Sequence, residues 1–317
     1  SSENLGHVGF RASTQPTIVH WISNWHDNSL QPSTGVLLLM LDRLAIATLV
    51  ENTASGRGLL GEHGLSFLLE TDSHRVLFDT GQGFVLRHNA EQLGMSLQRL
   101  DAIALSHGHY DHTGGLNAAL DACGGDTELF LHPQALDPKY SPRGYIGTPL
   151  PDPDTLVRRV RRLVLTEKPT EVVPGVHLTG SIPRSHPLED TGGSFWQDPE
   201  HQQVDALWDD QALFAEVPEG WVVLLGCAHA GVINTLDYIA ELTGSGKFYA
   251  LLGGMHLLRA NRERLNATVE AIARYDIQQV APVHCTGTAA TAFLWHRLGD
   301  RCLDCRVGTR VQFGGDT

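Results

Sequence analysis

The sequence contains no apolar run long enough to cross a membrane as a helix. Its longest such run, Val36–Leu41, ends at Asp42 and Arg43, whereas a membrane-spanning helix needs about 20 apolar residues. No basic segment followed by an apolar stretch and a cleavage site opens the chain. These absences argue against a membrane protein and favour a cytoplasmic location.

Cysteine is also scarce. The chain has five cysteines among 317 residues, and an odd number in a chain of this length does not build a disulfide framework. A reducing compartment is the simpler interpretation. Cys302 and Cys305 form a lone C-x-x-C pair, and without a second pair this spacing is weak support for a zinc or redox site.

Basic residues are outnumbered by acidic ones. Lys and Arg together number 23 against 36 Asp and Glu, which gives a formal net charge of −13. Such a surface argues against a nucleic-acid partner and against binding to an anionic membrane. It leaves room for a local basic pocket, so the expected partner is a small-molecule substrate.

The chain divides by pattern near residue 44. Residues 1–43 are mixed in composition and predict an N-terminal extension, which packs either on the domain or on a second subunit of a homo-oligomer. Over residues 44–317, short β-rich runs such as 100–106 and 221–229 alternate with helical patterns such as 231–242. Two sheet-rich halves with helices outside predict an α/β fold, a four-layer αββα sandwich, as one catalytic domain.

Residues 137–200 are rich in proline, glycine and charge and predict a loop-rich insertion, the usual place for substrate contacts. Arg143 and Arg184 lie there. An arginine presents a planar fork that matches phosphate or carboxylate oxygens, so both are candidate substrate-binding residues; the alternative is that they fix loops. The arginine-rich stretch 158–162 is interpreted as a solvated helical face.

The stretch HGHYDH, residues 107–112, contains four candidate metal ligands within six residues and follows an apolar strand. In an extended segment alternate side chains point the same way, so His107 and His109 can reach one ion. The chain then turns, and Asp111 and His112 can face a second ion. Four such groups would be costly to bury without a cation, and imidazole with carboxylate suits zinc, with manganese or iron as alternatives.

Two further histidines occupy matching positions at the ends of apolar strands. His229 ends the run 221–229, and His284 ends the run 278–284. Because strand ends of this kind converge on one edge of a sheet, both histidines can join the first cluster. Either one taken alone is more typical of a polar loop or a satisfied core histidine.

At these residues the sequence resembles the metallo-β-lactamase-fold superfamily, whose H-x-H-x-D-H motif stands here as residues 107–112. The segments LFDTG, GSIPR, GCAHAGVINTL, LLGGMHL and PVHCTG are similar to a branch described as dihydropterin-aminobenzene-phosphate synthase-like metallo-hydrolases. The likeness covers about residues 44–315. It implies two divalent metal ions, the first held by one trio of residues and the second by another: His107, His109 and His229, then Asp111, His112 and His284.

One position departs from the superfamily pattern. Gly253 and Gly254 stand where most members have an aspartate that bridges the two metals, which puts a tightly bridged centre in doubt. His256, two residues on, is a candidate ligand or proton donor, or else a buried group behind the ligands. Asp79 is expected to orient a ligand histidine through its second ring nitrogen.

The resemblance and the residues together predict a hydrolase in which Asp111 and His256 are catalytic and a metal-activated water attacks a small organic substrate, with or without a phosphate group. Two alternatives stay open. The first is a pterin-type synthase or lyase that forms a C–N bond at the same metal site. The second is a non-catalytic metal-binding sensor.

Overall fold

The computed structural model describes residues 39–315. The predicted N-terminal extension, residues 1–43, therefore lies almost wholly outside the described residues, as does any oligomer contact that it makes. The first strand, β1, is Arg43–Val50, so regular structure begins where the sequence pattern becomes regular.

One sheet has seven strands in the order β15-β1-β2-β3-β4-β5-β8. β1 pairs antiparallel with β15 and β2, and β2 pairs antiparallel with β3, whereas β3, β4, β5 and β8 run parallel. The bounds beyond β1 are β2 Ser66–Thr71, β3 Arg75–Phe78, β4 Ala102–Ala104, β5 Glu128–Leu131, β8 Arg162–Leu165 and β15 Arg310–Gly314.

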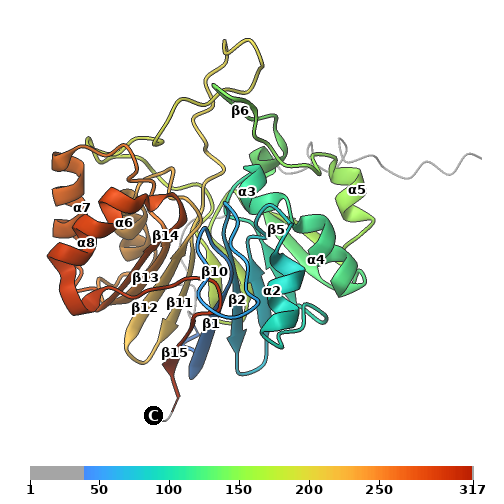
Figure 1. Ribbon diagram of the computed structural model, residues 1–317, viewed down its shortest axis with the longest axis horizontal. Helices are drawn as coiled ribbons and strands as arrows, with labels where there is room; N and C mark the ends of the chain where they lie inside the picture. The colour runs from blue at the N-terminus through green and yellow to red at the C-terminus, as the bar shows by residue number, and fades with distance from the viewer. Residues whose placement is uncertain (1–38, 316–317) are drawn as a thin grey trace, which may run out of the picture. The chain divides into compact units, whose positions relative to one another are not determined.

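The other large sheet has six strands in the order β14-β13-β12-β11-β10-β9. β12, β13 and β14 run parallel, and the remaining pairs are antiparallel. The bounds are β9 Thr170–Val173, β10 Val176–Leu178, β11 Leu213–Val217, β12 Gly220–Leu225, β13 Phe248–Gly254 and β14 Gln279–Val283. A small hairpin, β6 Tyr140–Ser141 with β7 Gly144–Tyr145, stands apart from both sheets (Figure 1).

Helices cover the outer faces of the two sheets (Figure 1). The helices beside the seven-stranded sheet are α2 Leu86–Gln92, α4 Leu116–Cys123 and α5 Pro153–Val157, and the one-turn helix α3 is Tyr110–Thr113. The helices beside the six-stranded sheet are α6 Val232–Thr243, α7 Arg262–Arg274 and α8 Thr288–Leu298. Short 3-10 turns are η1 Pro133–Leu136, η2 His284–Thr286 and η3 Gly299–Arg301. Within residues 39–315, none of the helices has both the length and the apolar character that a bilayer span requires.

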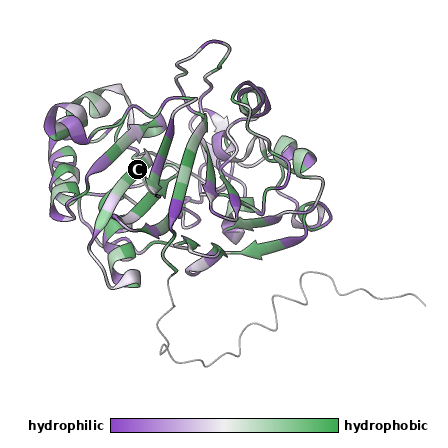
Figure 2. Cartoon of the chain, turned by 90° about the horizontal axis from the view of Figure 1, so that it is seen from below, coloured by the Kyte–Doolittle hydropathy of each residue, from purple (hydrophilic) through white to green (hydrophobic). Residues whose placement is uncertain are grey.

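Apolar side chains form three layers of core, in keeping with the alternation of side chains along each strand. Between the sheets, Phe67 and Phe78 of one sheet share a cluster with Val222 and Leu252 of the other. A second cluster joins the outer face of the seven-stranded sheet to α2 and α4, and a third joins the six-stranded sheet to α6, α7 and α8. Hydrophobic residues accordingly follow the strands in Figure 2. The predicted αββα sandwich is confirmed.

Helix ends follow from local sequence. α7 begins after Asn261, whose side-chain oxygen accepts a hydrogen bond from the backbone N–H of Arg264 at 2.9 Å, and such a cap satisfies a donor that the helix leaves unpaired. α6 buries Val232, Leu236 and Ile239, whose spacing places them on one face of a helix.

The segment 137–200, predicted as a loop-rich insertion, also contributes strands to both large sheets. It contains β8, β9 and β10, which extend the two large sheets. The arginine-rich stretch is not a helical face, because α5 ends at Val157 and Arg162 already begins β8. Arg161 and Arg162 instead pair with Glu128 on the neighbouring strand β5.

Candidate metal centre

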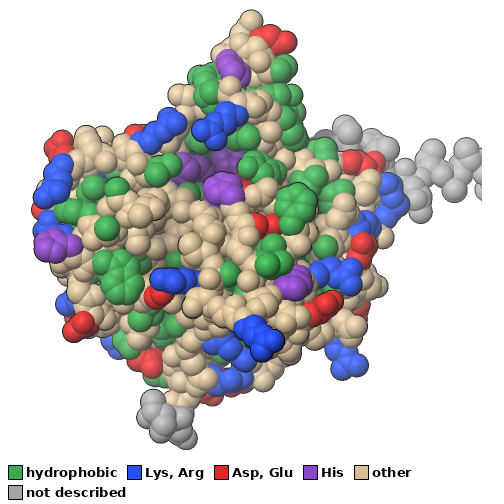
Figure 3. All heavy atoms as spheres, in the orientation of Figure 1, with side chains coloured by type: hydrophobic (Ala, Val, Ile, Leu, Met, Phe, Trp, Pro, Cys, Tyr) green, Lys and Arg blue, Asp and Glu red, His purple; other side chains and the backbone are tan. Residues whose placement is uncertain are grey.

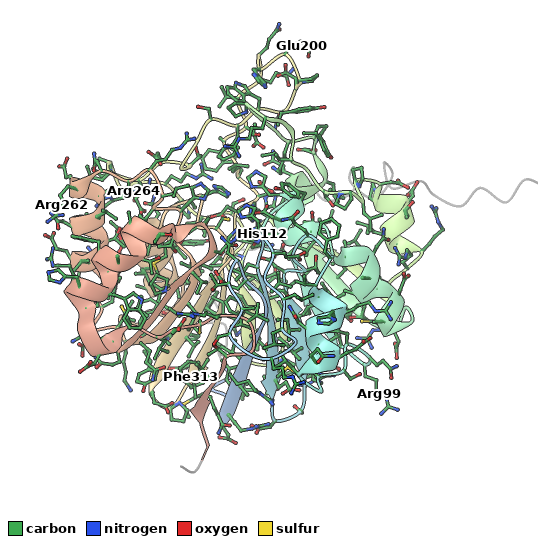
Figure 4. All side chains as sticks on the ribbon, in the orientation of Figure 1. Arg99, His112, Glu200, Arg262, Arg264 and Phe313 are labelled. Carbon is green, nitrogen blue, oxygen red and sulfur yellow. The ribbon has the colours of Figure 1, made fainter. Side chains whose placement is uncertain are left out.

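The candidate residues lie at the carboxyl ends of parallel strands, which meet at one edge of a sheet. Figure 4 labels His112, which lies at this edge of the strands. The chain leaves β3 at Asp79, β4 toward His107, β12 toward Cys227 and His229, β13 toward His256, and β14 at His284. Four non-glycine residues at these ends have a positive φ, a conformation that costs energy and is common at functional sites: Asp79, Ala228, His256 and His284.

His107, His109 and His229 converge, with their candidate ligand atoms within 4.8 Å of one another. Nε2 of His107 lies 2.9 Å from Nδ1 of His109. Nδ1 of His229 donates to the carbonyl oxygen of Thr191 at 2.8 Å, so Nε2 of His229 carries a lone pair. That Nε2 atom is buried without a hydrogen-bond partner, which is what a ligand to a cation requires.

Asp111, His112 and His284 form a neighbouring group. Nε2 of His112 lies 3.2 Å from Nε2 of His284, and Oδ2 of Asp111 lies 3.8 Å and 3.4 Å from these two atoms. Nδ1 of His284 faces Oδ1 of Asn52 at 3.0 Å, so its Nε2 is free to bind a cation. The structure thus brings together both predicted trios.

Asp79 orients two of the histidines from behind. Its Oδ2 accepts a hydrogen bond from Nδ1 of His112 at 2.7 Å and another from the Ser106 hydroxyl at 2.7 Å. Ser106 Oγ in turn accepts from Nδ1 of His107 at 2.8 Å. Both Nδ1–H groups are therefore used, and the Nε2 atoms of both rings face the pocket. The expected orienting role of Asp79 matches these contacts.

Burial and neighbouring charge set the protonation of the candidate ligands. Burial lowers the pKa of His107, His109 and His229 well below the usual range, so each is a neutral imidazole. Burial also opposes a charge on His112, but the carboxylates of Asp79 and Asp111 raise the pKa of His112 to about 9. Burial alone would raise the pKa of Asp111, yet His112, His284 and His63 hold it well below its usual range.

A buried ion triad of Lys139, Asp205 and Asp209 holds the loop of the HGHYDH motif in place. Lys139 Nζ lies 2.9 Å from Oδ1 of Asp209 and 3.0 Å from Oδ2 of Asp205, and all three side chains are buried. Oδ2 of Asp209 accepts the backbone N–H of Gly108 at 2.8 Å. A Cβ atom on Gly108 would lie 2.3 Å from the carbonyl oxygen of Ala135, so a side chain there would displace the loop.

Gly114 and Gly115 stand between the HGHYDH motif and α4 without an unusual backbone conformation. Both have ordinary helical dihedrals. Their absent side chains instead allow close packing, because a Cβ atom would lie 2.4 Å from the Gln82 carbonyl oxygen at Gly114 and 2.1 Å from that of Thr80 at Gly115.

Two cysteines that sequence reasoning did not select, Cys227 and Cys285, also belong to the site. Cys227 Sγ lies 3.1 Å from Nε2 of His112 and groups with His107 and His112, while a further group joins Cys227, Cys285 and His256. In the sequence, their positions beside His229 and His284 in GCAH and PVHC were the signal that could have identified them.

Gly254 has no room for a bridging aspartate, since its Cβ would lie 2.6 Å from Sγ of Cys285.

His256 lines the same pocket as the two trios. Its ring stacks at a tilt against His229, with centroids 4.3 Å apart, and its Nδ1 is buried without a hydrogen-bond partner. Burial opposes a charge on His256, but the neighbouring Cys285 raises its pKa. His256 thus lies on the pocket wall beside the candidate ligands.

The pocket above the site has a volume of about 1210 Å³. Figure 3 shows histidine side chains in a hollow of the surface with basic side chains close by. Arg143, a candidate substrate-binding residue, lines this pocket, and so does Arg259. Both are exposed, and neither guanidinium forms an ion pair with another residue of the described part of the chain.

Arg184 does not line the pocket, which argues against the prediction that it contacts substrate. Its guanidinium donates to the carbonyl oxygens of Ala206 and Leu207 and lies over the ring of Trp208. It therefore fixes the loop, the alternative considered for this residue. The sequence specified the residue type but not the direction of its side chain.

Asn52 and His63 both contact candidate ligands. Asn52 accepts from His284, and Nε2 of His63 lies 3.1 Å from Oδ2 of Asp111. Phe195 adds an aromatic wall, with its ring centroid 5.2 Å from that of His109 and 5.3 Å from that of His229. No local motif marked Phe195, because its loop returns to the site from far along the chain.

Comparison with known proteins places this geometry in a family. The model of the metallo-beta-lactamase superfamily matches residues 60–183. A protein of Methanocaldococcus jannaschii named 7,8-dihydropterin-6-methyl-4-(beta-D-ribofuranosyl)-aminobenzene-5'-phosphate synthase is 29% identical over 289 residues, which cover 86% of this chain and 98% of that protein. An uncharacterised protein of the same organism is 30% identical over 245 residues, 77% of this chain and 91% of its own length.

A solved structure supports the same relationship. Tm1679, described as a metal-dependent hydrolase of the beta-lactamase superfamily, is 30% identical, with a TM-score of 0.74 over 86% of this chain and 100% of its own. The resemblance inferred from the sequence motifs is confirmed, and the chain belongs to the metallo-β-lactamase superfamily.

Proposed function

We propose that this protein is a metal-dependent hydrolase of a small organic anion, with a binuclear centre of divalent ions, preferably zinc. The observation that carries the proposal is the convergence of two ligand trios, with Nε2 atoms of His107, His112 and His284 all left free by hydrogen bonds on the other ring nitrogen. His107, His109 and His229 would hold one ion, and Asp111, His112 and His284 the other. Manganese or iron would suit the same donors.

Divalent ions held there supply Lewis-acid chemistry, which activates water and polarises the carbonyl or phosphoryl oxygen under attack. The chain's own groups then position the reactants. Oδ2 of Asp111 is within hydrogen-bond reach of His63, and this carboxylate would orient the attacking water. His256, whose pKa Cys285 raises, lines the same pocket and can donate a proton to the leaving group.

The charge of the pocket supports an anionic substrate. Although the chain carries a net charge of −13, Arg143 and Arg259 stand exposed on the pocket wall. A guanidinium without a carboxylate partner is well suited to phosphate or carboxylate. The relative from Methanocaldococcus jannaschii is named for a phosphate-bearing compound, which supports a phosphorylated substrate here.

A synthase is the second candidate, because that relative is named a synthase of a pterin-linked aminobenzene ribose phosphate. Reaction in ¹⁸O-labelled water distinguishes the two functions. Screening of esters, lactones and phosphoesters should yield a product that contains one solvent oxygen. Joining of a pterin to an aminobenzene ribose phosphate, without solvent oxygen in the product, would replace hydrolase by synthase.

Metal content tests the centre itself. Elemental analysis of the wild-type protein purified without added metal should give about two divalent ions per chain. Asp111→Ala and His284→Ala should each lose one, whereas Asp304→Ala, which removes an exposed carboxylate at the pocket rim, should lose none. One ion in the wild type and in all variants would rule out the binuclear centre.

A further inference from the structure

The two ligand trios lack the group that would join them. Among their six members Asp111 is the one carboxylate, and its Oδ2 lies with His112 and His284. At Gly254, where an aspartate would bridge, a Cβ atom would meet the carbonyl oxygen of Gly226 at 2.4 Å and Sγ of Cys285 at 2.6 Å. A single anionic ligand for two divalent ions leaves a large positive charge in a buried site, which is costly unless another anion is present.

Cys227 lies where such an anion is needed. Its Sγ lies within 4.8 Å of the candidate ligand atoms of both His107 and His112, one from each trio, and only 3.1 Å from Nε2 of His112. The side chain is buried at the carboxyl end of β12, two residues before His229. No other group of candidate ligands among the described residues combines a member of each trio with a cysteine or an acid.

Cys285 is close by but faces elsewhere. It groups with Cys227 and His256 rather than with His107, His109, Asp111 or His112, and its Sγ points toward the carbonyl oxygen of Cys227 at 3.5 Å. The sulfur of Cys285 occupies the space beside Gly254. It therefore acts as packing that closes the usual bridging position.

We propose that Cys227 is a seventh metal ligand, whose thiolate bridges the two ions in place of the missing aspartate. A thiolate sulfur has enough lone pairs to bind two ions at once, and cysteine thiolate is a preferred ligand of zinc. The inference rests on the metal centre of the proposed function but not on its reaction. A thiolate at this position would add one soft sulfur ligand to a set of nitrogen and oxygen ligands from histidine and aspartate.

X-ray absorption at the zinc edge tests this in the wild-type protein, so the result does not depend on a variant that folds poorly. A zinc–sulfur shell at about 2.3 Å should accompany the zinc–nitrogen shell at about 2.0–2.1 Å. Cobalt substitution should likewise give a sulfur-to-cobalt charge-transfer band. Zinc bound through nitrogen and oxygen alone would overturn the inference and leave the metal centre standing, whereas failure to bind zinc at all would overturn both.

Cys227→Ser and Cys285→Ser form a matched pair that identifies the sulfur. Cys227→Ser should lose the sulfur shell and bind the second ion at least about 10-fold more weakly. Removal of a group that only supports a metal ligand already lowers metal affinity by about 10-fold or more. Cys285→Ser should keep both. A sulfur shell that survives Cys227→Ser, or that disappears in Cys285→Ser, would overturn the assignment; circular dichroism confirms that each variant is folded.

Discussion

The carboxylate of Asp79 accepts a hydrogen bond from Nδ1 of His112 at 2.7 Å, and this contact fixes which nitrogen of His112 faces the pocket. Asp79 is wholly buried and also accepts the backbone N–H and the hydroxyl of Ser106. Asp79 thus controls the ring orientation of one candidate ligand in each trio, His112 directly and His107 through Ser106.

Asp79→Asn tests this control. An amide group cannot accept all three of these hydrogen bonds with the same two atoms, so the orientation of His112 should loosen and metal affinity should fall about 10–100-fold. Competition with a chelator of known affinity measures the change. Asp101→Asn is the control, because Asp101 also accepts a backbone N–H, from Arg75, but lies outside the site. Equal affinities in wild type and Asp79→Asn would mean that the histidines hold their orientation without the carboxylate.

Lys139→Met probes the ion triad beneath the HGHYDH loop. The change leaves Asp205 and Asp209 buried without their shared cation, and removal of one partner of a buried pair costs about 3–5 kcal/mol of the free energy of unfolding. Urea denaturation measures the loss. Lys168→Met, at an exposed lysine, should change stability by less than about 0.5 kcal/mol. A similar small change for Lys139→Met would show that the triad contributes little.

The parts of the site that the sequence predicts are those written into short motifs. His107, His109, Asp111 and His112 stand within six residues, and His229 and His284 each end an apolar strand, so the general behaviour of parallel strand ends suffices to bring them together. The same reasoning predicts the αββα layers from alternating strand and helix patterns.

What the sequence does not predict depends on contacts between distant segments. The hydrogen bond from Gly108 to Asp209 and that from His229 to Thr191 join parts of the chain that no local pattern relates. Arg184 has the chemistry of an anion-binding residue, but packing against Trp208 decides where its guanidinium points. Cys227 was adjacent to a predicted ligand, yet only the fold shows that its sulfur lies between the two trios.

Arg143 and Arg259 should determine the preference for anionic substrates. A hydrogen bond to a charged group is worth about 1.5–3 kcal/mol, so Arg143→Ala and Arg259→Ala should each raise KM for a phosphorylated ester about 10-fold or more. KM for the matching neutral ester should stay unchanged. Arg306→Ala is the control, since Arg306 lines the same pocket but already donates to Asp304 at 2.8 Å. Equal effects on both esters would point to a change in pocket shape instead of charge recognition.

His177 predicts a pH dependence of stability that is separate from the metal centre. It lies on β10, is buried, and stacks on Phe214 with ring centroids 5.4 Å apart. Burial lowers the pKa of His177, and Glu171 on the neighbouring strand only partly opposes this. The folded protein therefore takes up a proton at His177 less readily than the unfolded chain does. The contribution of neutral His177 to stability is present above the unfolded pKa of about 6.5 and is lost as the pH falls through that value toward the lower folded pKa.

His177→Phe removes this titration and keeps an aromatic ring against Phe214. Urea denaturation at about pH 7.5 and about pH 5.5 should show a smaller loss of stability on acidification in the variant than in the wild type, by at most about 1.4 kcal/mol per pH unit. The histidines of the metal centre are present in both proteins, so their titration cancels in this comparison. His296→Gln, which changes an exposed histidine, should leave the wild-type pH dependence intact. An unchanged slope in His177→Phe would mean that His177 accepts its proton in the folded protein as readily as in the unfolded chain, because the stacked ring and Glu171 then offset its burial.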